Sequence, residues 1–136
     1  MTLTYNNDQH RLYLEFTDGI GQGWIEVFEG DTQFYSAAYW DLLTAVWRAE
    51  GPVRKTDALG FMTAIKSPHT AGKYIEQALS FGYLVETDNP ADARSKLITM
   101  APDTHKRMDQ FFDDVVGKWR KTILDVERRG PSPEIE

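Results

Sequence analysis

The 136-residue chain contains no cysteine. This absence excludes a disulfide framework, a thiolate zinc site, a catalytic cysteine and cysteine-based redox sensing. No apolar run approaches the ~20 residues that span a bilayer, and the first ten residues lack the basic and apolar regions of a signal peptide. We therefore expect one cytoplasmic domain, or one domain with arms, that has no membrane partner and is large enough to bury an ordinary core.

Basic residues are also scarce, with 15 Lys and Arg against 21 Asp and Glu and a formal net charge of -6. Taken as a total, this charge argues against a nucleic-acid partner, because binding a polyanion needs a positive surface. The distribution is uneven, however, because residues 1–50 hold eight acidic and two basic residues and residues 51–136 sum to zero. Residues 51–74 contain one acid, Asp57, and a basic segment that indicates a binding face. Its four cations are Arg54, Lys55, Lys66 and Lys73.

The N-terminal segment shows a two-residue period. Leu12, Leu14 and Phe16 alternate with polar residues, as in a half-buried strand. The glycine-rich stretch DGIGQG follows at 18–23, and residues 24–28 are apolar enough for a second strand. This pattern predicts a β-hairpin extension over residues 1–33. The glycines lack the lysine of a P-loop and the full spacing of a dinucleotide-binding fingerprint, so we interpret them as a turn.

A helical period begins further along the chain, where apolar residues recur every four positions from Phe34 to Val46. This spacing predicts a helix of about four turns. Asp31 or Thr32 is its candidate N-cap, and Gly51-Pro52 is its stop.

Two more helices are predicted in the centre of the chain. The first is short, over residues 56–62, with Thr56 available as its cap. The second covers residues 69–81 and is opened by Ser67-Pro68, an N-cap followed by proline at the first helical position. Gly82 is a natural stop for this helix.

The last part of the chain predicts a hairpin and a long helix. Two strand-like runs, 83–87 and 96–100, flank a polar turn that contains Asn89-Pro90. Pro102 then opens an amphipathic helix that extends to residue 129, and its apolar face is wide enough to be partly buried against another chain. We expect residues 130–136 to be a disordered tail.

This order of elements is that of a winged helix-turn-helix domain, a mainly α fold with small β-hairpins (α+β). Residues 34–101 would form the DNA-binding domain and residues 102–129 a dimerisation helix. In such a domain the capped helix enters the major groove, while the hairpin reaches phosphates or the minor groove. Free N–H groups at the helix start can bind a phosphate, and polar side chains beside them can contact base edges. The candidate DNA-binding residues are Lys66, Ser67, His69, Thr70, Lys73, Arg94 and Lys96.

Four segments resemble the recognition helix and wing of MarR-type transcriptional regulators. They are S-P-H-T at 67–70, G-Y-L-V at 82–85, D-N-P-A-D-A-R at 88–94 and K-L-I-T at 96–99. The resemblance covers about residues 36–129. It implies sequence-specific binding of double-stranded DNA, and hence a transcriptional regulator.

The resemblance also carries expectations about single residues and partners. It implies that Asp92 orients the wing or the recognition helix through a salt bridge, and that Arg94 enters the minor groove. It implies a homodimer built from terminal helices and a small, often aromatic, effector bound between the dimerisation region and the DNA-binding lobe. The predicted N-terminal hairpin departs from the long first helix of that family.

Other functions compete with this interpretation. Lys66, Lys73 and Arg94 can be solvated surface charges. The alternative function is a winged-helix protein-interaction module whose acidic half repels DNA. A weaker third hypothesis is a small-molecule sensor or enzyme that uses the aromatic N-terminal segment.

Sites for metals, cofactors and catalysis have little support in the sequence. His10, His69 and His105 share no ligand spacing, and no local Ser/His/Asp signature occurs. We therefore predict no metal site, no cofactor and no enzymatic activity. A set of aromatic residues either lines an effector pocket or, as we favour, packs in the core. These residues are Trp24, Phe28, Phe34, Tyr35, Tyr39 and Trp40.

Overall fold

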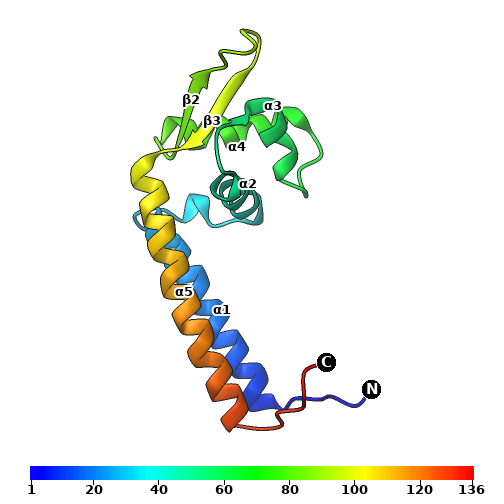
Figure 1. Ribbon diagram of the computed structural model, residues 1–136. Helices are drawn as coiled ribbons and strands as arrows, with labels where there is room; N and C mark the ends of the chain where they lie inside the picture. The colour runs from blue at the N-terminus through cyan, green and yellow to red at the C-terminus, as the bar shows by residue number, and fades with distance from the viewer. The chain divides into compact units, whose positions relative to one another are not determined.

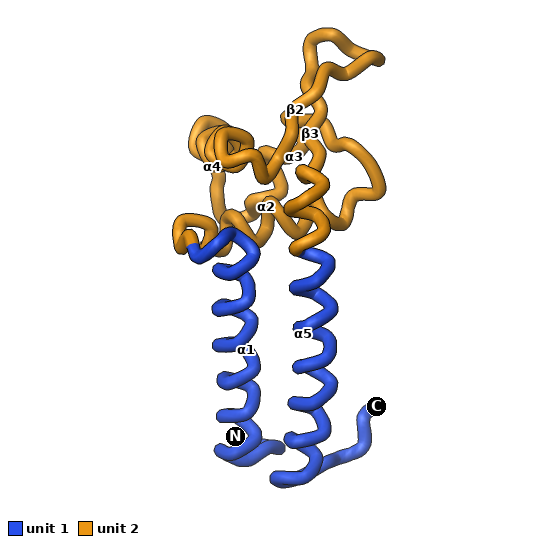
Figure 2. Tube along the Cα trace, turned by 90° about the vertical axis from the view of Figure 1, so that its left-hand side faces the viewer, with its two compact units in different colours: residues 1–30, 108–136 blue, residues 31–107 orange.

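The computed structural model describes all 136 residues, and the chain divides into two compact units (Figure 2). Residues 1–30 and 108–136 form the first, which we call the helical unit. Residues 31–107 form the second, the winged unit.

The helical unit consists mainly of two long helices, α1 (Asn7–Val27) and the greater part of α5 (Pro102–Arg128). They run side by side in opposite directions (Figure 1). None of the chain's helices combines the length and the apolar character that crossing a membrane requires. The long C-terminal helix predicted from residue 102 is confirmed and corresponds to α5.

The N-terminal β-hairpin prediction is wrong, because residues 7–27 form one continuous helix. Leu12, Phe16, Ile20 and Trp24 recur every four residues and are buried or half-buried, whereas Leu14 is exposed. The apparent two-residue alternation was therefore a short part of a helical period. The glycine-rich stretch is helix as well, not a turn.

Side-chain hydrogen bonds join the start of α1 to the end of α5. The buried Gln9 donates through Nε2 to the carbonyl oxygens of Val126 at 2.8 Å and Pro131 at 2.9 Å. Asn6 caps α1 through a reciprocal capping box with Gln9 and donates through Nδ2 to the carbonyl oxygen of Arg129 at 2.9 Å. These bonds bring side-chain donors to carbonyl oxygens at and just beyond the end of α5, where a helix has few backbone donors left.

Three α-helices and a small sheet make up most of the winged unit. They are α2 (Ala37–Arg48), α3 (Lys55–Ala58), α4 (Pro68–Ser80), β1 (Val53–Arg54), β2 (Leu84–Asp88) and β3 (Lys96–Met100). Short 3-10 helices precede α2 (Thr32–Phe34) and follow α3 (Leu59–Phe61). The predicted helices and hairpin of this region are confirmed in type and order.

Two predicted caps in this unit are wrong. Asp31 caps the short 3-10 helix through Gln33, and Ser36 is the residue that caps α2. Thr56 lies inside α3, which has no side-chain cap. Helix α2 begins at Ala37, whereas the predicted period began at Phe34, and α3 begins at Lys55 instead of Thr56, so both capping positions differ from the prediction.

The sheet is antiparallel in the order β1-β3-β2, and its two longer strands, β2 and β3, lie side by side in Figure 1. Leu84 pairs with Met100 and Asp88 with Lys96, so β2 and β3 form the predicted hairpin. Strand β1 is only two residues long and was not predicted. The chain passes from α4 to β2 through Gly82, whose φ of 78° is a conformation that favours glycine.

Candidate nucleic-acid interface

The N-terminus of α4 is an exposed, polar helix start. Ser67 is its N-cap, and its hydroxyl oxygen accepts a hydrogen bond from the backbone N–H of Thr70 at 3.3 Å. Pro68 occupies the first turn, as the sequence predicted. The N–H groups that remain free at such a start point outward and favour an anion such as a phosphate.

The five predicted contact residues around this helix start are all exposed. They are Lys66, Ser67, His69, Thr70 and Lys73. No carboxylate lies within ion-pair distance of Lys66 or Lys73, so both charges are available to a ligand. His69 and Lys73 also line an open groove of about 800 Å³ along α4, together with Glu76 and Gln77.

The wing loop between β2 and β3 is held by side-chain bonds to its own backbone. The amide oxygen of Asn89 accepts from the N–H of Ala91 at 3.0 Å, and its amide nitrogen donates to the hydroxyl of Ser95 at 2.9 Å. One carboxylate oxygen of Asp92 accepts from the N–H of Arg94 at 3.0 Å. The sequence indicated only that Asn89 lies in a turn. Its bond to Ser95 could not be predicted, because it joins the two ends of the loop and depends on how the loop folds.

Both cations of the wing have acidic neighbours. The Nε of Arg94 lies 3.4 Å from Asp92, while the Arg94 side chain is 92% exposed. Lys96 pairs with Asp88, and their hydrogen bond and opposite charges raise the pKa of Lys96 and lower the pKa of Asp88. The contacts of Asp92 stay within the wing, where they hold the Arg94 backbone and side chain, so Asp92 makes no salt bridge to α4.

The basic segment of the sequence is divided by the fold. Arg54 pairs with Asp57, and Lys55 pairs with Glu76 and Glu86. Only Lys66 and Lys73 of the four cations have no acidic partner. The sequence could not reveal this, because Glu76 and Glu86 reach Lys55 only through tertiary structure.

The charge of the chain is distributed by unit. The winged unit holds nine basic and nine acidic residues, and the helical unit holds six basic and twelve acidic residues. The whole net charge of -6 therefore belongs to the helical unit. The unit that carries the candidate interface is neutral overall, with unpaired cations at one helix start.

The aromatic residues considered for an effector pocket are mostly core. Trp24, Phe28, Phe34 and Tyr39 are buried, whereas Tyr35 and Trp40 are exposed. Burial, with a smaller contribution from Tyr74, raises the pKa of Tyr39 to about 12. No three His, Asp or Glu side chains gather where they could hold a metal ion.

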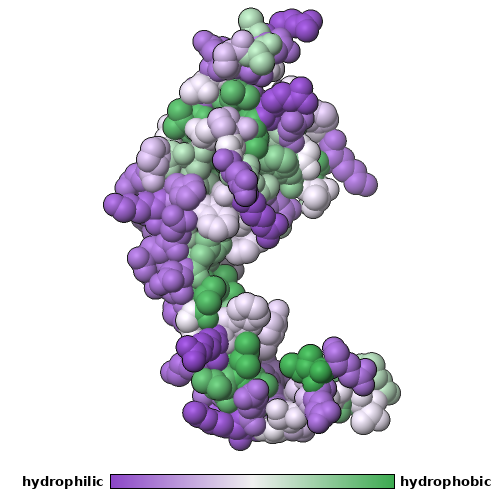
Figure 3. Space-filling view, viewed as in Figure 1, coloured by the Kyte–Doolittle hydropathy of each residue, from purple (hydrophilic) through white to green (hydrophobic).

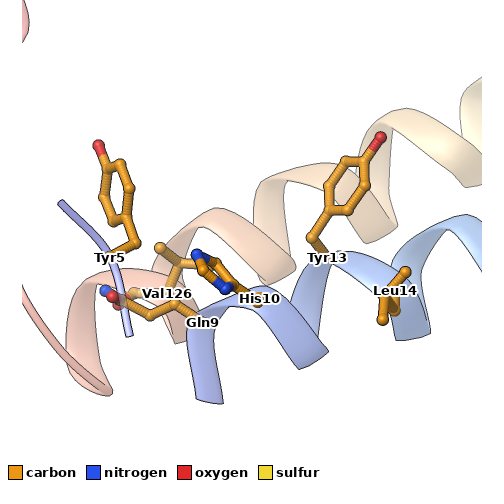
Figure 4. Close-up of a pocket in the computed structure, with 6 residues that line it drawn as sticks. All are labelled: Tyr5, Gln9, His10, Tyr13, Leu14 and Val126. Atoms are coloured by element: carbon orange, nitrogen blue, oxygen red, sulfur yellow. The ribbon is translucent and has the colours of Figure 1, made fainter. Parts of the chain in front are cut away.

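The helical unit exposes apolar side chains on both of its helices. Figure 3 shows hydrophobic residues among hydrophilic ones on the face in view. Trp119 on α5 is 54% exposed, and Tyr13 on α1 is 61% exposed. A groove of about 430 Å³ lies where α1 begins, with Tyr5 and Tyr13 on either side of His10 (Figure 4). An exposed apolar surface of this kind is typical of a surface that binds another protein.

Comparison with known proteins identifies the fold. No protein-family model and no curated protein matches the chain. Among solved structures, a MarR-like transcription regulator from Bacillus cereus is similar with a TM-score of 0.55 and 15% identity, over 84% of this chain and 76% of that chain. A transcriptional regulator from Thermotoga maritima is similar with a TM-score of 0.59 and 18% identity, over 88% of this chain and 81% of that chain. The chain therefore has the winged-helix fold of MarR-like transcription regulators.

Proposed function

We propose that this protein is a dimeric, sequence-specific DNA-binding regulator of the MarR type that acts without enzymatic chemistry. The observation that carries the proposal is the exposed, Ser67-capped start of α4 with the unpaired Lys66 and Lys73 beside it. The similarity in fold to proteins described as transcription regulators supports it.

The residues divide the work of binding by their chemistry. The α4 N–H groups, Lys66 and Lys73 suit backbone phosphates, which set the position of the protein on the duplex. His69 and Thr70 present donors and acceptors of a kind that contacts base edges in the major groove. Arg94, at the tip of a braced wing, suits the minor groove beside it.

Two copies are needed for a site of useful affinity, and the helical unit offers the surface that joins them. Its exposed apolar residues include Trp119 and Ile123 on α5. We expect Trp119→Glu to convert a dimer into a monomer in sedimentation velocity, whereas Lys118→Glu, an exposed neighbour, leaves the dimer intact. A wild-type protein that sediments as a monomer at micromolar concentration contradicts this part of the proposal.

The test of function begins with selection of duplexes from a random pool by the wild-type protein. The selected duplex, about 40 base pairs long, accommodates two half-sites one helical turn apart. We expect Lys73→Ala and Arg94→Ala each to weaken its binding and to reduce the slope of log K against log salt by about 0.9 for each lost phosphate contact. Lys106→Ala removes a charge from α5 and serves as the control. Unchanged affinity in both test variants refutes the proposed interface.

One observation favours a second function, a winged-helix module that binds protein rather than DNA. The winged unit is neutral, and both wing cations have acidic partners. Such a module would show no salt-dependent binding of any duplex and no enrichment in the selection, so the same experiment separates the two functions.

A further inference from the structure

Lys55 occupies a junction between three elements of the winged unit. It is the first residue of α3 and directly follows β1, whose pairing with β3 fixes the local backbone. Its Nζ lies 2.5 Å from Glu76 of α4 and 2.9 Å from Glu86 of β2. One ammonium group therefore links the recognition helix to the first strand of the wing.

The two carboxylates would repel each other without this cation. Both lie within hydrogen-bond distance of a single atom, and like charges so close destabilise the arrangement that holds them. The Lys55 side chain is 27% exposed, that of Glu86 30% and that of Glu76 62%. Water therefore screens the Lys55–Glu86 pair only in part and the Lys55–Glu76 pair more strongly. Partial burial lowers the pKa of Lys55, but the hydrogen bonds and charges of Glu76 and Glu86 outweigh this effect, so the pKa is raised overall. Lys55 therefore stays positively charged across the neutral range.

Glu76 also lines the groove along α4 that contains His69 and Lys73. A carboxylate there faces the same polyanion that Lys73 is placed to bind. Lys55 offsets the negative charge of Glu76. Any contribution of Lys55 to DNA affinity would therefore depend on Glu76 being charged.

We propose that Lys55 is a positioning residue that holds the recognition helix α4 against wing strand β2 by cancelling the repulsion between Glu76 and Glu86. The inference rests on the proposed function, because it assigns to Lys55 a role in DNA binding that involves no contact with DNA. It predicts that Lys55 matters only while both glutamates are charged.

The test is a cycle of variants measured on the selected duplex. Lys55→Met should lower affinity roughly tenfold. Lys55→Arg should bind like the wild-type protein, because a guanidinium can reach the same two carboxylates. Adding Glu76→Gln and Glu86→Gln to Lys55→Met also restores most of the affinity, although the lysine is still missing. Because these two substitutions also remove carboxylates that face the DNA, the triple variant is compared with Glu76→Gln/Glu86→Gln alone, and the two should bind equally. A lysine that touched a phosphate directly would leave the triple variant about tenfold weaker than that double variant, and that result overturns the inference.

A measurement without DNA separates this inference from the proposed function. Amide hydrogen exchange in the last turn of α4 and in β2 should be faster in Lys55→Met and return to the wild-type rate in the triple variant, with Lys106→Met as an unchanged control. Unchanged exchange in Lys55→Met refutes the positioning role. If exchange responds as expected but the wild-type protein binds no duplex, the proposed function and the DNA role of Lys55 fail together, while the link between α4 and β2 stands.

Discussion

Two glycines of α1 give a matched pair for testing how its helix packs against α5. Gly19 and Gly23 both lie inside the helix, where alanine is favoured over glycine by about 1 kcal/mol. A Cβ at Gly19 would have no atom within 4 Å. A Cβ at Gly23 would lie 3.1 Å from the ring of Phe111, which is buried and packs edge-on against Trp24 at 5.7 Å. The same substitution therefore meets open space at one site and a fixed ring at the other.

The magnitudes follow from these surroundings. Gly19→Ala should raise the free energy of unfolding by about 1 kcal/mol. Gly23→Ala has the same gain in helix propensity, but overpacking against Phe111 costs roughly 1–3 kcal/mol. We expect Gly23→Ala to be less stable than Gly19→Ala by about that amount.

Urea unfolding at one fixed protein concentration measures the difference, because the stability of the proposed dimer would depend on concentration. The cost of Gly23→Ala should be smaller when it is measured in a Phe111→Leu background, since the smaller side chain gives the new methyl group room. Equal stabilisation by Gly19→Ala and Gly23→Ala would refute the packing of Phe111 against Gly23.

Three further predictions follow from single side chains. Gln9→Leu removes a side chain that bonds to two carbonyl groups and one N–H, and should lower the free energy of unfolding by roughly 1–3 kcal/mol; Gln22→Leu, at an exposed site of the same helix, should show no such loss in the same urea titration. Because the pKa of Tyr39 is raised in the folded state, the protonated phenol contributes stability in full below pH 10, and this contribution is lost as the pH rises towards 12. Tyr39→Phe should therefore show a shallower fall in unfolding free energy between pH 10 and 12, and an unchanged fall contradicts the raised pKa. Asn89→Ala breaks the bonds that close the wing loop, and should weaken binding of the selected duplex severalfold with an unchanged melting temperature; unchanged affinity would show that the loop needs no such brace.

Helix α4 and the wing could be predicted because their signals are local. Ser67 and Pro68 are adjacent in the chain and start α4 by their own chemistry, and Gly82 supplies the positive φ that leads into β2. The hairpin strands are likewise neighbours in sequence. Signals of this kind need no knowledge of the rest of the fold.

The first helix could not be predicted because its glycines depend on a distant residue. At Gly23 the Phe111 ring of α5 approaches the backbone of α1 so closely that a larger side chain would be crowded. Without that knowledge, a glycine-rich stretch after the alternation of Leu12, Leu14 and Phe16 indicates strand and turn. With α1 as a helix, the departure from the long first helix of MarR-type proteins disappears.

The sequence also could not predict which cations of the candidate interface lack an acidic partner. Lys55 and Lys66 are equivalent in a count of cations, yet the fold places Lys55 between two glutamates and leaves Lys66 exposed and unpaired. A tally over residues 51–74 therefore overestimates the positive surface. Ion pairs between separate elements appear only when the elements are packed.

This pairing would limit how strongly one copy binds DNA under the proposed function. Lys66 and Lys73 are unpaired, and Arg94 is held only by a 3.4 Å contact to Asp92, so each copy would bring about three cations to the duplex and the proposed dimer about six. The expected slope of log K against log salt is then about -5 for the dimer. Trp119→Glu, which leaves α4 and the wing unchanged, should halve that slope and remove most of the affinity, because the two copies no longer act as one ligand. A monomeric variant that keeps the wild-type slope and affinity would show that a single winged unit carries the whole of the binding.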